Sequence, residues 1–289
     1  MTKIVVIGHS GFIGQNMLNC CSDRGYTCHV LDRSKTCLTS RSDTAAALYN
    51  VAPDAVIFLG CPSPINVAME KRFLSEYLIS IENVIYAMPS TCKFVYAGSM
   101  AEFGRSGIHK EDSIRSPNST YGFLKMIAVD RVIAALQMCN KTGVIARLFG
   151  VYGPGEAQTR LIPSLISSLH GNQEVLLSDG LQQRDFVYVA DVVNVLLDLA
   201  LQTAENNIEM CNVGTGTGII VRELCIRLAE AMDKPKSLLK FGTKPRLPYD
   251  EEVLIADTSH LKKILKWSPT NRFSDESFLQ NLVDVYNLR

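Results

Sequence analysis

The chain has 289 residues, 47% of them hydrophobic, and its 29 Lys and Arg residues are matched by 29 Asp and Glu residues. This balance excludes the basic footprint of a nucleic-acid-binding protein, and a chain of this size buries enough surface for one large domain and a smaller lobe. No apolar run is long enough to cross a membrane and no signal peptide is recognised, so no membrane partner is expected.

The cysteines and histidines exclude two further classes. Nine cysteines are scattered without a Cys-x-x-Cys pair, and five histidines share no metal-ligand spacing. We therefore expect a cytoplasmic protein with reduced cysteines, no metal and no histidine-based triad.

The N-terminus has the pattern of a strand, a glycine turn and a helix. An apolar strand at 3–8 runs into the spacing Gly8, Gly11 and Gly14, and a helical pattern continues over 11–24. Glycines permit a tight turn and let backbone N–H groups at the helix N-terminus approach a pyrophosphate. The turn is expected to bind a dinucleotide cofactor through Gly8, Ser10, Gly11, Phe12, Ile13 and Gly14.

A second strand at 27–31 ends in Asp32, close to the offset at which an acid binds the adenosine ribose hydroxyls. Asp32 therefore favours NAD. Arg33 follows it and is suited to a 2′-phosphate, so NADP stays open. The alternative for Asp32 is a turn aspartate at a strand end.

Strands and helices continue to alternate along the chain. Further strands are predicted at 55–60, 93–98, 143–149 and 209–213, and helices at 43–50, 70–88, 119–139 and 190–202. This alternation predicts an α/β fold with a Rossmann-type, doubly wound parallel sheet. Leu59 and Gly60 are expected to run past the cofactor, and Cys61 is expected to pack in the core.

Helix 119–139 is apolar nearly all round, with few polar residues besides Lys125, Asp130, Arg131 and Gln137. One face buried against the sheet does not account for such a helix. We expect a homodimer formed through the 70–88 and 119–139 helices.

After residue 150 the sequence becomes rich in glycine, proline and loops, followed by helices near 221–233, 258–265 and 274–286. The expected division is a dinucleotide-binding domain of residues 1–155 with 186–214, and a substrate-binding lobe of residues 156–185 with 215–289.

Tyr121 and Lys125 are the candidate proton-transfer pair. A helix places residues four apart on one face, where an ammonium favours the phenolate form of a tyrosine. Ser99, just after a strand, is placed to hydrogen-bond the substrate oxygen whose proton the tyrosine takes or gives. The alternative for the pair alone is an exposed helix contact.

Assembled in order, these residues resemble the extended short-chain dehydrogenase/reductases, the nucleotide-sugar NAD-dependent epimerase/dehydratase family, over nearly the whole chain. The motifs are Gly8-x-x-Gly11-x-x-Gly14, Asp32, Ser99, Tyr121-x-x-x-Lys125, Arg147 to Gly155, Arg184 to Asp191 and Asn212 to Gly216. The resemblance implies a nucleotide-diphosphate sugar substrate, catalysis by Ser99, Tyr121 and Lys125, and contact of Tyr121 and Lys125 with the cofactor, Lys125 holding the nicotinamide ribose.

The resemblance also implies three substrate-binding residues. Arg184 would contact the nucleotide or diphosphate, Arg246 is a second diphosphate candidate, and Gly150 stands where an asparagine commonly holds the sugar or its phosphate. The alternative for Arg184 is an ion pair with Asp185 or Asp191, and for Arg246 a structural role is equally open.

The residues after Ser99 narrow the reaction. In the resembling enzymes, dehydratases carry acidic groups at the positions of Met100 and Ala101, whereas decarboxylases carry a glutamate and epimerase-reductases a cysteine at the latter position. Neither methionine nor alanine transfers a proton. Glu102 lies one position later and is predicted to be a surface or structural carboxylate.

The favoured reaction is reduction of a 4-keto-6-deoxyhexose nucleotide, with Tyr121 as proton donor. The segment between Asp32 and Asp54 is too short for the long third strand and helix usual in sugar 4-epimerases and is similar to that of the compact reductases. Asp32 with a tightly held NAD instead favours a 4-epimerase. A non-catalytic NAD-binding regulatory protein is the remaining alternative, and retention of the serine, tyrosine and lysine argues against it.

Overall fold

Alternating apolar side chains build the first strand of the central sheet. The structure is a computed structural model and describes residues 2–32, 35–61, 71–202, 207–248, 250–271, 273 and 275–287. On β1 (Lys3–Ile7), Ile4 and Val6 enter one core cluster, and Val5 and Ile7 enter another. Successive side chains of a strand point to opposite faces, so this sheet is buried on both sides.

The sheet has six parallel strands in the order β2-β1-β3-β4-β6-β11. They are β1, β2 (Thr27–Val30), β3 (Ala55–Phe58), β4 (Lys93–Ser99), β6 (Gly143–Leu148) and β11 (Ile208–Val213). All six predicted strands are confirmed. The strand predicted at 55–60 ends at Phe58, which leaves Leu59 and Gly60 in the following turn.

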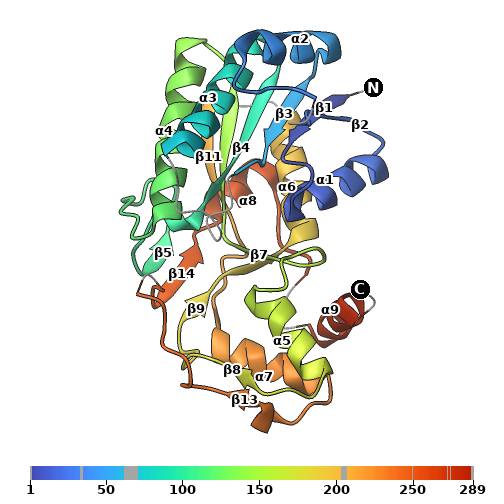
Figure 1. Ribbon diagram of the computed structural model, residues 1–289, viewed down its shortest axis with the longest axis vertical. Helices are drawn as coiled ribbons and strands as arrows, with labels where there is room; N and C mark the ends of the chain where they lie inside the picture. The colour runs from blue at the N-terminus through green and yellow to red at the C-terminus, as the bar shows by residue number, and fades with distance from the viewer. Residues whose placement is uncertain are drawn as a thin grey trace.

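Helices cover both faces of this sheet, as Figure 1 shows. One face carries α1 (Phe12–Asp23), α6 (Val189–Leu201) and α8 (Ser259–Leu265), and the other carries α2 (Arg41–Val51), α3 (Lys71–Ala87) and α4 (Thr120–Met138). The predicted doubly wound α/β fold is confirmed. Residue 70, the expected first residue of α3, lies outside the described residues.

A smaller lobe has its own core. Tyr152 and the apolar faces of α5 (Leu161–His170), α7 (Val221–Ala231) and α9 (Glu276–Asn287) form it. Helix α5 was missed by the sequence analysis, which predicted loops in this region. Pro163 is one of the residues that favoured the loop prediction. A proline in the first turn of a helix removes no intrahelical hydrogen bond, however, and is tolerated.

The remaining elements are short. They are β5 (Gly107–His109), β7 (Gly150–Tyr152), β8 (Val175–Leu176), β9 (Gln183–Arg184), β10 (Phe186–Tyr188), β12 (Ile219–Ile220), β13 (Leu239–Lys240), β14 (Val253–Ala256) and the 3₁₀ helices η1 (Met100–Glu102) and η2 (Lys236–Leu238). Strand β5 pairs with β14, while Leu261 of α8 joins the core cluster under α6. We propose the two-part division expected from the sequence, with β14 and α8 of the second part packed against the first.

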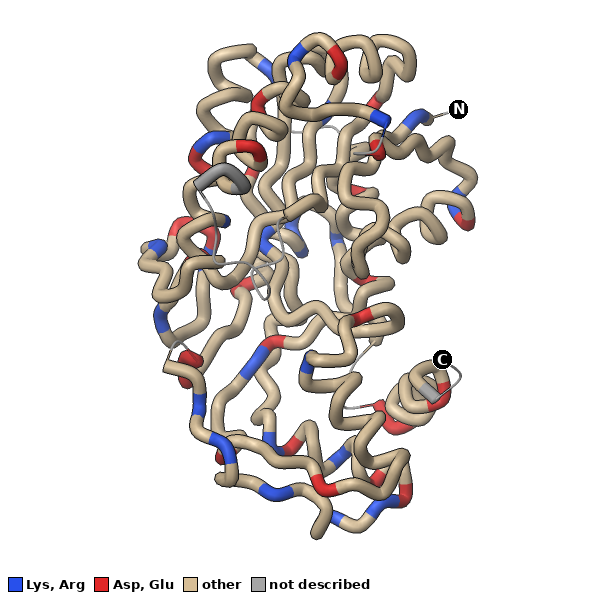
Figure 2. Tube along the Cα trace, viewed as in Figure 1, with Lys and Arg blue, Asp and Glu red and all other residues tan. Residues whose placement is uncertain are grey.

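Charges of both signs are interspersed over the sheet region and the lobe (Figure 2). Among the residues that the structure describes, no helix is long and apolar enough to cross a membrane. All nine cysteines are free thiols.

Glu156 is a buried carboxyl group of the lobe. Its side chain is 8% exposed, the Arg160 guanidinium lies 3.5 Å away, and its Oε2 atom has no hydrogen-bond partner among the described residues. Burial raises the pKa of Glu156 to about 7, against the opposing effect of Arg160. The folded chain therefore binds this proton more tightly than the unfolded chain does.

We expect the free energy of unfolding to fall as the pH rises from 4.5 to about 7, because the unfolded chain releases the Glu156 proton first. Glu156→Gln should remove most of that fall, on the order of 2–3 kcal/mol at about 1.4 kcal/mol per pKa unit. Urea unfolding of both chains at about pH 5 and about pH 8 measures the difference. If the free energy of unfolding changed equally with pH in the two chains, Glu156 would not be the group responsible.

Candidate functional site

Glycines bring β1, α1 and the turn after β3 into close contact. Gly8 has a φ of +92°, and a Cβ atom there would lie 2.5 Å from the backbone N of Gly60. A Cβ atom at Gly14 would lie 2.2 Å from the carbonyl oxygen of Gly8. The N–H groups of Leu59 and Gly60 both donate to the Ile7 carbonyl, at 2.8 and 3.0 Å. Only glycine fits positions 8 and 14 without a shift of the backbone.

The start of α1 suits a pyrophosphate. Gly11 occupies the N-cap without a side-chain capping bond, so no side chain competes for the N–H groups of the first turn, where Phe12 and Ile13 follow. Ser10 is exposed beside them. Such a helix N-terminus favours an anion through its N–H groups and its dipole. The turn present here therefore fits the cofactor that the sequence predicts.

Asp32 lies half-buried just after β2, and its carbonyl accepts the N–H groups of Lys35 and Thr36 at 3.0 and 2.8 Å. The parallel register of β1 and β2 places it at the carboxyl edge of the sheet, beside the glycine turn. Arg33, the candidate for a 2′-phosphate, lies outside the described residues.

Gly14→Ala is expected to weaken NADH binding by more than about tenfold, the equivalent of about 1.4 kcal/mol. The added methyl would strike the Gly8 carbonyl and open the turn. Titration of nicotinamide fluorescence measures the dissociation constant. Gly171→Ala is the matched control, because the nearest atom to a Cβ there is 3.6 Å away. Binding by the Gly14 variant equal to that of the control would contradict the assignment.

Ser99, at the end of β4, starts the 3₁₀ helix η1. Its Oγ accepts the N–H of Ala101 at 3.2 Å, and its own N–H donates to Glu102 Oε1 at 2.9 Å. A hydroxyl that accepts in this way keeps its hydrogen for another partner. The Ser99 side chain is thus held in place with a donor to offer.

Tyr121 lies in the first turn of α4, which Ser119 caps by accepting the N–H of Gly122 at 3.1 Å. A Cβ atom at Gly122 would lie 2.3 Å from the Ala101 carbonyl oxygen. This close approach presses the start of α4 against the residues that follow Ser99. The structure therefore brings the predicted serine and tyrosine to one region of the sheet edge.

Lys125 lies one turn further along α4 and is 3% exposed. Its Nζ donates to the Ala97 carbonyl at 2.8 Å and lies 5.9 Å from the centroid of the Tyr121 ring. Burial by itself lowers the pKa of this ammonium, but Tyr96 and then Tyr121 raise it above its usual value. Lys125 is therefore a buried cation that faces the tyrosine, and the alternative of an exposed helix pair is wrong.

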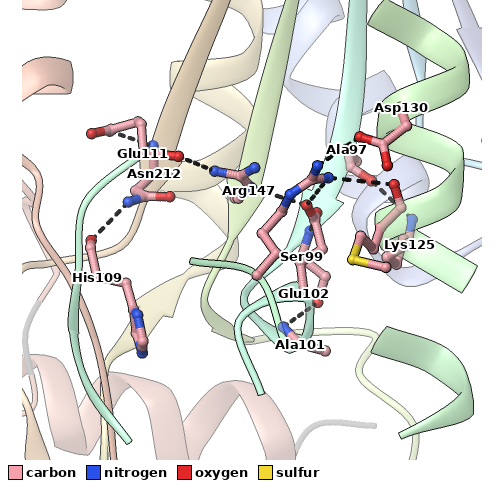
Figure 3. A network of polar contacts seen from close by, with 12 residues as sticks. Ala97, Ser99, Ala101, Glu102, His109, Glu111, Lys125, Asp130, Arg147 and Asn212 are labelled. Carbon is pink, nitrogen blue, oxygen red and sulfur yellow. Dashed lines mark hydrogen bonds and ion pairs between the residues drawn. The ribbon is translucent and has the colours of Figure 1, made fainter. Parts of the chain in front are cut away.

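Glu102 is committed to a buried network (Figure 3). Its Oε2 lies 3.0 Å from Arg147 Nε, and both side chains are almost fully buried. Arg147 also donates to the Glu111 carbonyl at 2.7 Å and lies 5.2 Å from the centroid of the Phe103 ring. Both Glu102 oxygens hold the local fold, one on Ser99 and one on Arg147, as the structural interpretation predicts.

The chain matches the model of the NAD dependent epimerase/dehydratase family over residues 4–214, more than half of its length. It belongs to this family. Nicotinamide dinucleotide is thus the cofactor class, and nucleotide sugars are the substrate class of this group of enzymes.

Solved structures share the fold of this epimerase/dehydratase family member. dTDP-glucose 4,6-dehydratase from Bacillus anthracis, in complex with NAD, has a TM-score of 0.85 at 18% identity and covers 100% of this chain and 97% of its own. UDP-glucose 4-epimerase from Thermotoga maritima, with UDP-glucose, has a TM-score of 0.85 at 23% identity, with 99% of each chain covered. RMD from Pseudomonas aeruginosa, complexed with NADPH, has a TM-score of 0.83 at 22% identity, with 100% of each chain covered.

The three predicted substrate residues of this family member lie in the segments that connect the sheet to the lobe. Arg184 is buried on β9 and pairs with Asp250, so the expected alternative partners Asp185 and Asp191 are wrong. Asp185 instead accepts N–H groups of the turn after β11, at Thr215 (2.7 Å) and Gly216 (2.9 Å).

Arg246 Nε lies 2.6 Å from Asp179 Oδ1, and the same guanidinium pairs with Glu252. Gly150 donates its N–H to the Asp185 carbonyl at 2.9 Å, and a Cβ atom there would lie 2.8 Å from the same oxygen. The structure thus holds each of the two arginines on carboxylates of this chain.

Sequence reasoning missed the partner of Arg184 and the two tyrosines near Lys125. Asp250 holds Arg184 from a position far along the chain, and the acidic run Asp250-Glu251-Glu252 gives no signal of that role. Tyr77 and Tyr96 lie behind Lys125, but each falls inside an apolar helix or strand pattern that predicts only core packing.

Proposed function

We propose that this family member is an NAD(P)-dependent nucleotide-sugar oxidoreductase that reduces a 4-keto-6-deoxyhexose nucleotide. The observation that supports this most is the commitment of Glu102 to Arg147 and to the Ser99 N–H. The residues beside Ser99 that remain are Met100 and Ala101, and neither side chain transfers a proton. Dehydration needs a second acid or base, whereas reduction of a ketone needs one hydride and one proton.

In the proposed reaction the cofactor supplies the hydride when bound. Ser99 donates a hydrogen bond to the substrate oxygen, and Tyr121 gives its phenolic proton to the same oxygen as the alkoxide develops. The Lys125 ammonium stabilises the phenolate that remains. The glycine turn from Gly8 to Gly14 would hold the pyrophosphate, with Leu59 and Gly60 beside it.

A 4-epimerase is the second candidate, because Asp32 at the end of β2 suits a tightly held NAD. The reductase is favoured because β2 is the edge of the six-stranded sheet and the described segment 35–54 holds α2 but no strand. This matches the compact architecture expected of the reductases. We propose NAD as the preferred cofactor on the same aspartate.

Arg184 and Arg246 are proposed to bind the substrate diphosphate, and Gly150 to border the sugar. Both arginines already carry carboxylate partners, and a diphosphate would replace or join them. Arginine forms bidentate hydrogen bonds to carboxylate and to phosphate oxygens. The carboxylate partners would therefore keep both guanidinium groups in position for a diphosphate.

Turnover of a nucleotide-diphosphate 4-keto-6-deoxyhexose with NADH or NADPH tests the proposal. A reductase consumes one reduced cofactor per sugar, followed by nicotinamide absorbance. A 4-epimerase would consume none, interconvert the C4 epimers of a nucleotide hexose and copurify with its cofactor. Binding of NADH without turnover of either substrate would favour the regulatory alternative.

We also propose a homodimer through α3 and α4 and a cytoplasmic location, the latter in keeping with the free thiols. Ile79 of α3 and Phe123 and Ile127 of α4 are exposed apolar side chains on these adjacent helices. Ile127→Asp is expected to yield a monomer in analytical ultracentrifugation. Ile114→Asp, in an exposed loop, is the control and should stay dimeric. A monomeric wild-type chain would overturn the dimer.

A further inference from the structure

Tyr77 and Tyr96 form a buried pair behind Lys125. Tyr96, from β4, is fully buried, and Tyr77, from α3, is 4% exposed. Their hydroxyl oxygens lie 2.7 Å apart, and both rings pack near Phe58. Phenylalanine at both positions would fill the same space without burying a polar group. Packing alone therefore does not account for the two hydroxyl groups.

The Tyr96 side of the pair lies beside the ammonium of Lys125. Nζ lies 5.0 Å from the centroid of the Tyr96 ring while it donates to the Ala97 carbonyl. The Tyr96 ring attracts the ammonium and favours its charged form, which burial by itself disfavours. An ammonium has three N–H donors, so the bond to Ala97 leaves two for the cofactor or for Tyr121.

Both phenols keep their hydrogens at neutral pH. Burial raises the pKa of Tyr96 to about 12, against the opposing effect of Lys125, and burial raises the pKa of Tyr77 well above its usual value. The two hydroxyl groups therefore share one hydrogen bond, in which either oxygen can be the donor. The result is a chain of contacts from α4 through β4 to α3.

We propose that Tyr96, held by Tyr77, is a positioning residue that directs the Lys125 ammonium toward Tyr121 and toward the nicotinamide ribose. This inference rests on the proposed function, because it assigns the pair to that site. Without the hydroxyl contact to Tyr77, the Tyr96 ring and the ammonium beside it gain freedom, so Lys125 stabilises the Tyr121 phenolate less. The phenol of Tyr121 then holds its proton more tightly, whether the enzyme reduces the ketone or oxidises the alcohol.

Each element that packs against Lys125 or against the Tyr77–Tyr96 pair contributes a titratable group. They are Tyr121 on α4, Tyr96 on β4, Tyr77 on α3, Cys61 after β3 and Glu102 on η1. Only the tyrosine on α4 is proposed to exchange a proton with substrate. A change in the pH profile caused by the pair is therefore expected to act through that tyrosine.

The first test is NADH binding by Tyr96→Phe, measured by nicotinamide fluorescence. The dissociation constant is expected to rise about fivefold, the size of one weakened hydrogen bond. Tyr152→Phe is the matched control: it also removes a buried hydroxyl, one without a hydrogen-bond partner among the described residues, in the lobe core. Equal NADH affinity in the two variants overturns the proposal. This readout holds even if the proposed substrates are not turned over, so the two failures are distinguishable.

The second test is the pair of variants Tyr77→Phe and Tyr96→Phe, singly and together. Tyr77→Phe should weaken NADH binding less than Tyr96→Phe and add nothing in the double variant, because it acts only through Tyr96. Additive effects would overturn the role of Tyr77. With a substrate that is turned over, Tyr96→Phe should also move the Tyr121-dependent limb of kcat/KM to higher pH, and an unmoved limb would count against the proposal. Should Tyr96→Phe fail to fold, Tyr77→Phe carries both readouts.

Discussion

Tyr121→Phe is expected to reduce kcat/KM for sugar reduction by about 10²–10⁴-fold, the range for loss of a positioned proton donor. The phenol lies in the capped first turn of α4 with the buried Lys125 ammonium facing it, and no side chain at Met100 or Ala101 can replace it. NADH binding should weaken by less than about tenfold, since one hydrogen bond at most is lost. Stopped-flow or steady-state loss of nicotinamide absorbance measures the first quantity and fluorescence titration the second.

Tyr49→Phe is the control for this substitution, because Tyr49 is 84% exposed on α2. It should leave both quantities within a factor of about two, as expected of a surface change. If Tyr121→Phe retained the wild-type rate, the mechanism proposed for Ser99, Tyr121 and Lys125 would be wrong. Loss of NADH binding together with activity would instead assign Tyr121 mainly to the cofactor.

Glu102→Ala is expected to lower the free energy of unfolding by about 3–5 kcal/mol, the effect of breaking a buried ion pair from one side. The substitution leaves the Arg147 guanidinium, 1% exposed, without its carboxylate, and it removes the acceptor of the Ser99 N–H. Arg115, at 3.9 Å from Glu102, also loses a partner but keeps Asp130 at 2.6 Å. Urea unfolding measures the change.

The double variant Glu102→Ala with Arg147→Met separates the ion pair from the rest of the network. Because the buried charge is then absent, much of the lost stability should return. Activity per folded molecule should stay within about tenfold of wild type in both variants, since Ser99 loses one orienting bond. A stable Glu102→Ala variant without activity would make Glu102 a proton-transfer group and reopen dehydration.

The sheet and the glycine turn were predictable because their signals are local. Alternation along β1 and the glycine spacing from Gly8 to Gly14 each depend on residues close together in the chain. Helix α5 was missed because Pro163 and the serines around it carry the local signal of a loop. Its burial in the lobe core, which decides the helix, depends on α7 and α9 far away in the chain.

Tyr121 and Lys125 show where the local signal ends. Their spacing predicts that they share a helix face, but the burial of Lys125 depends on β4 and on α3. The sequence by itself determined the fold class, the glycine turn and the shared helix face of this pair, because periodicity and turn chemistry act over a few residues. Only the tertiary structure decided that Glu102 is committed to Arg147, that Arg184 meets Asp250, and that Tyr77 supports Tyr96. These contacts join segments distant in the chain, and their partners are set by how the layers pack.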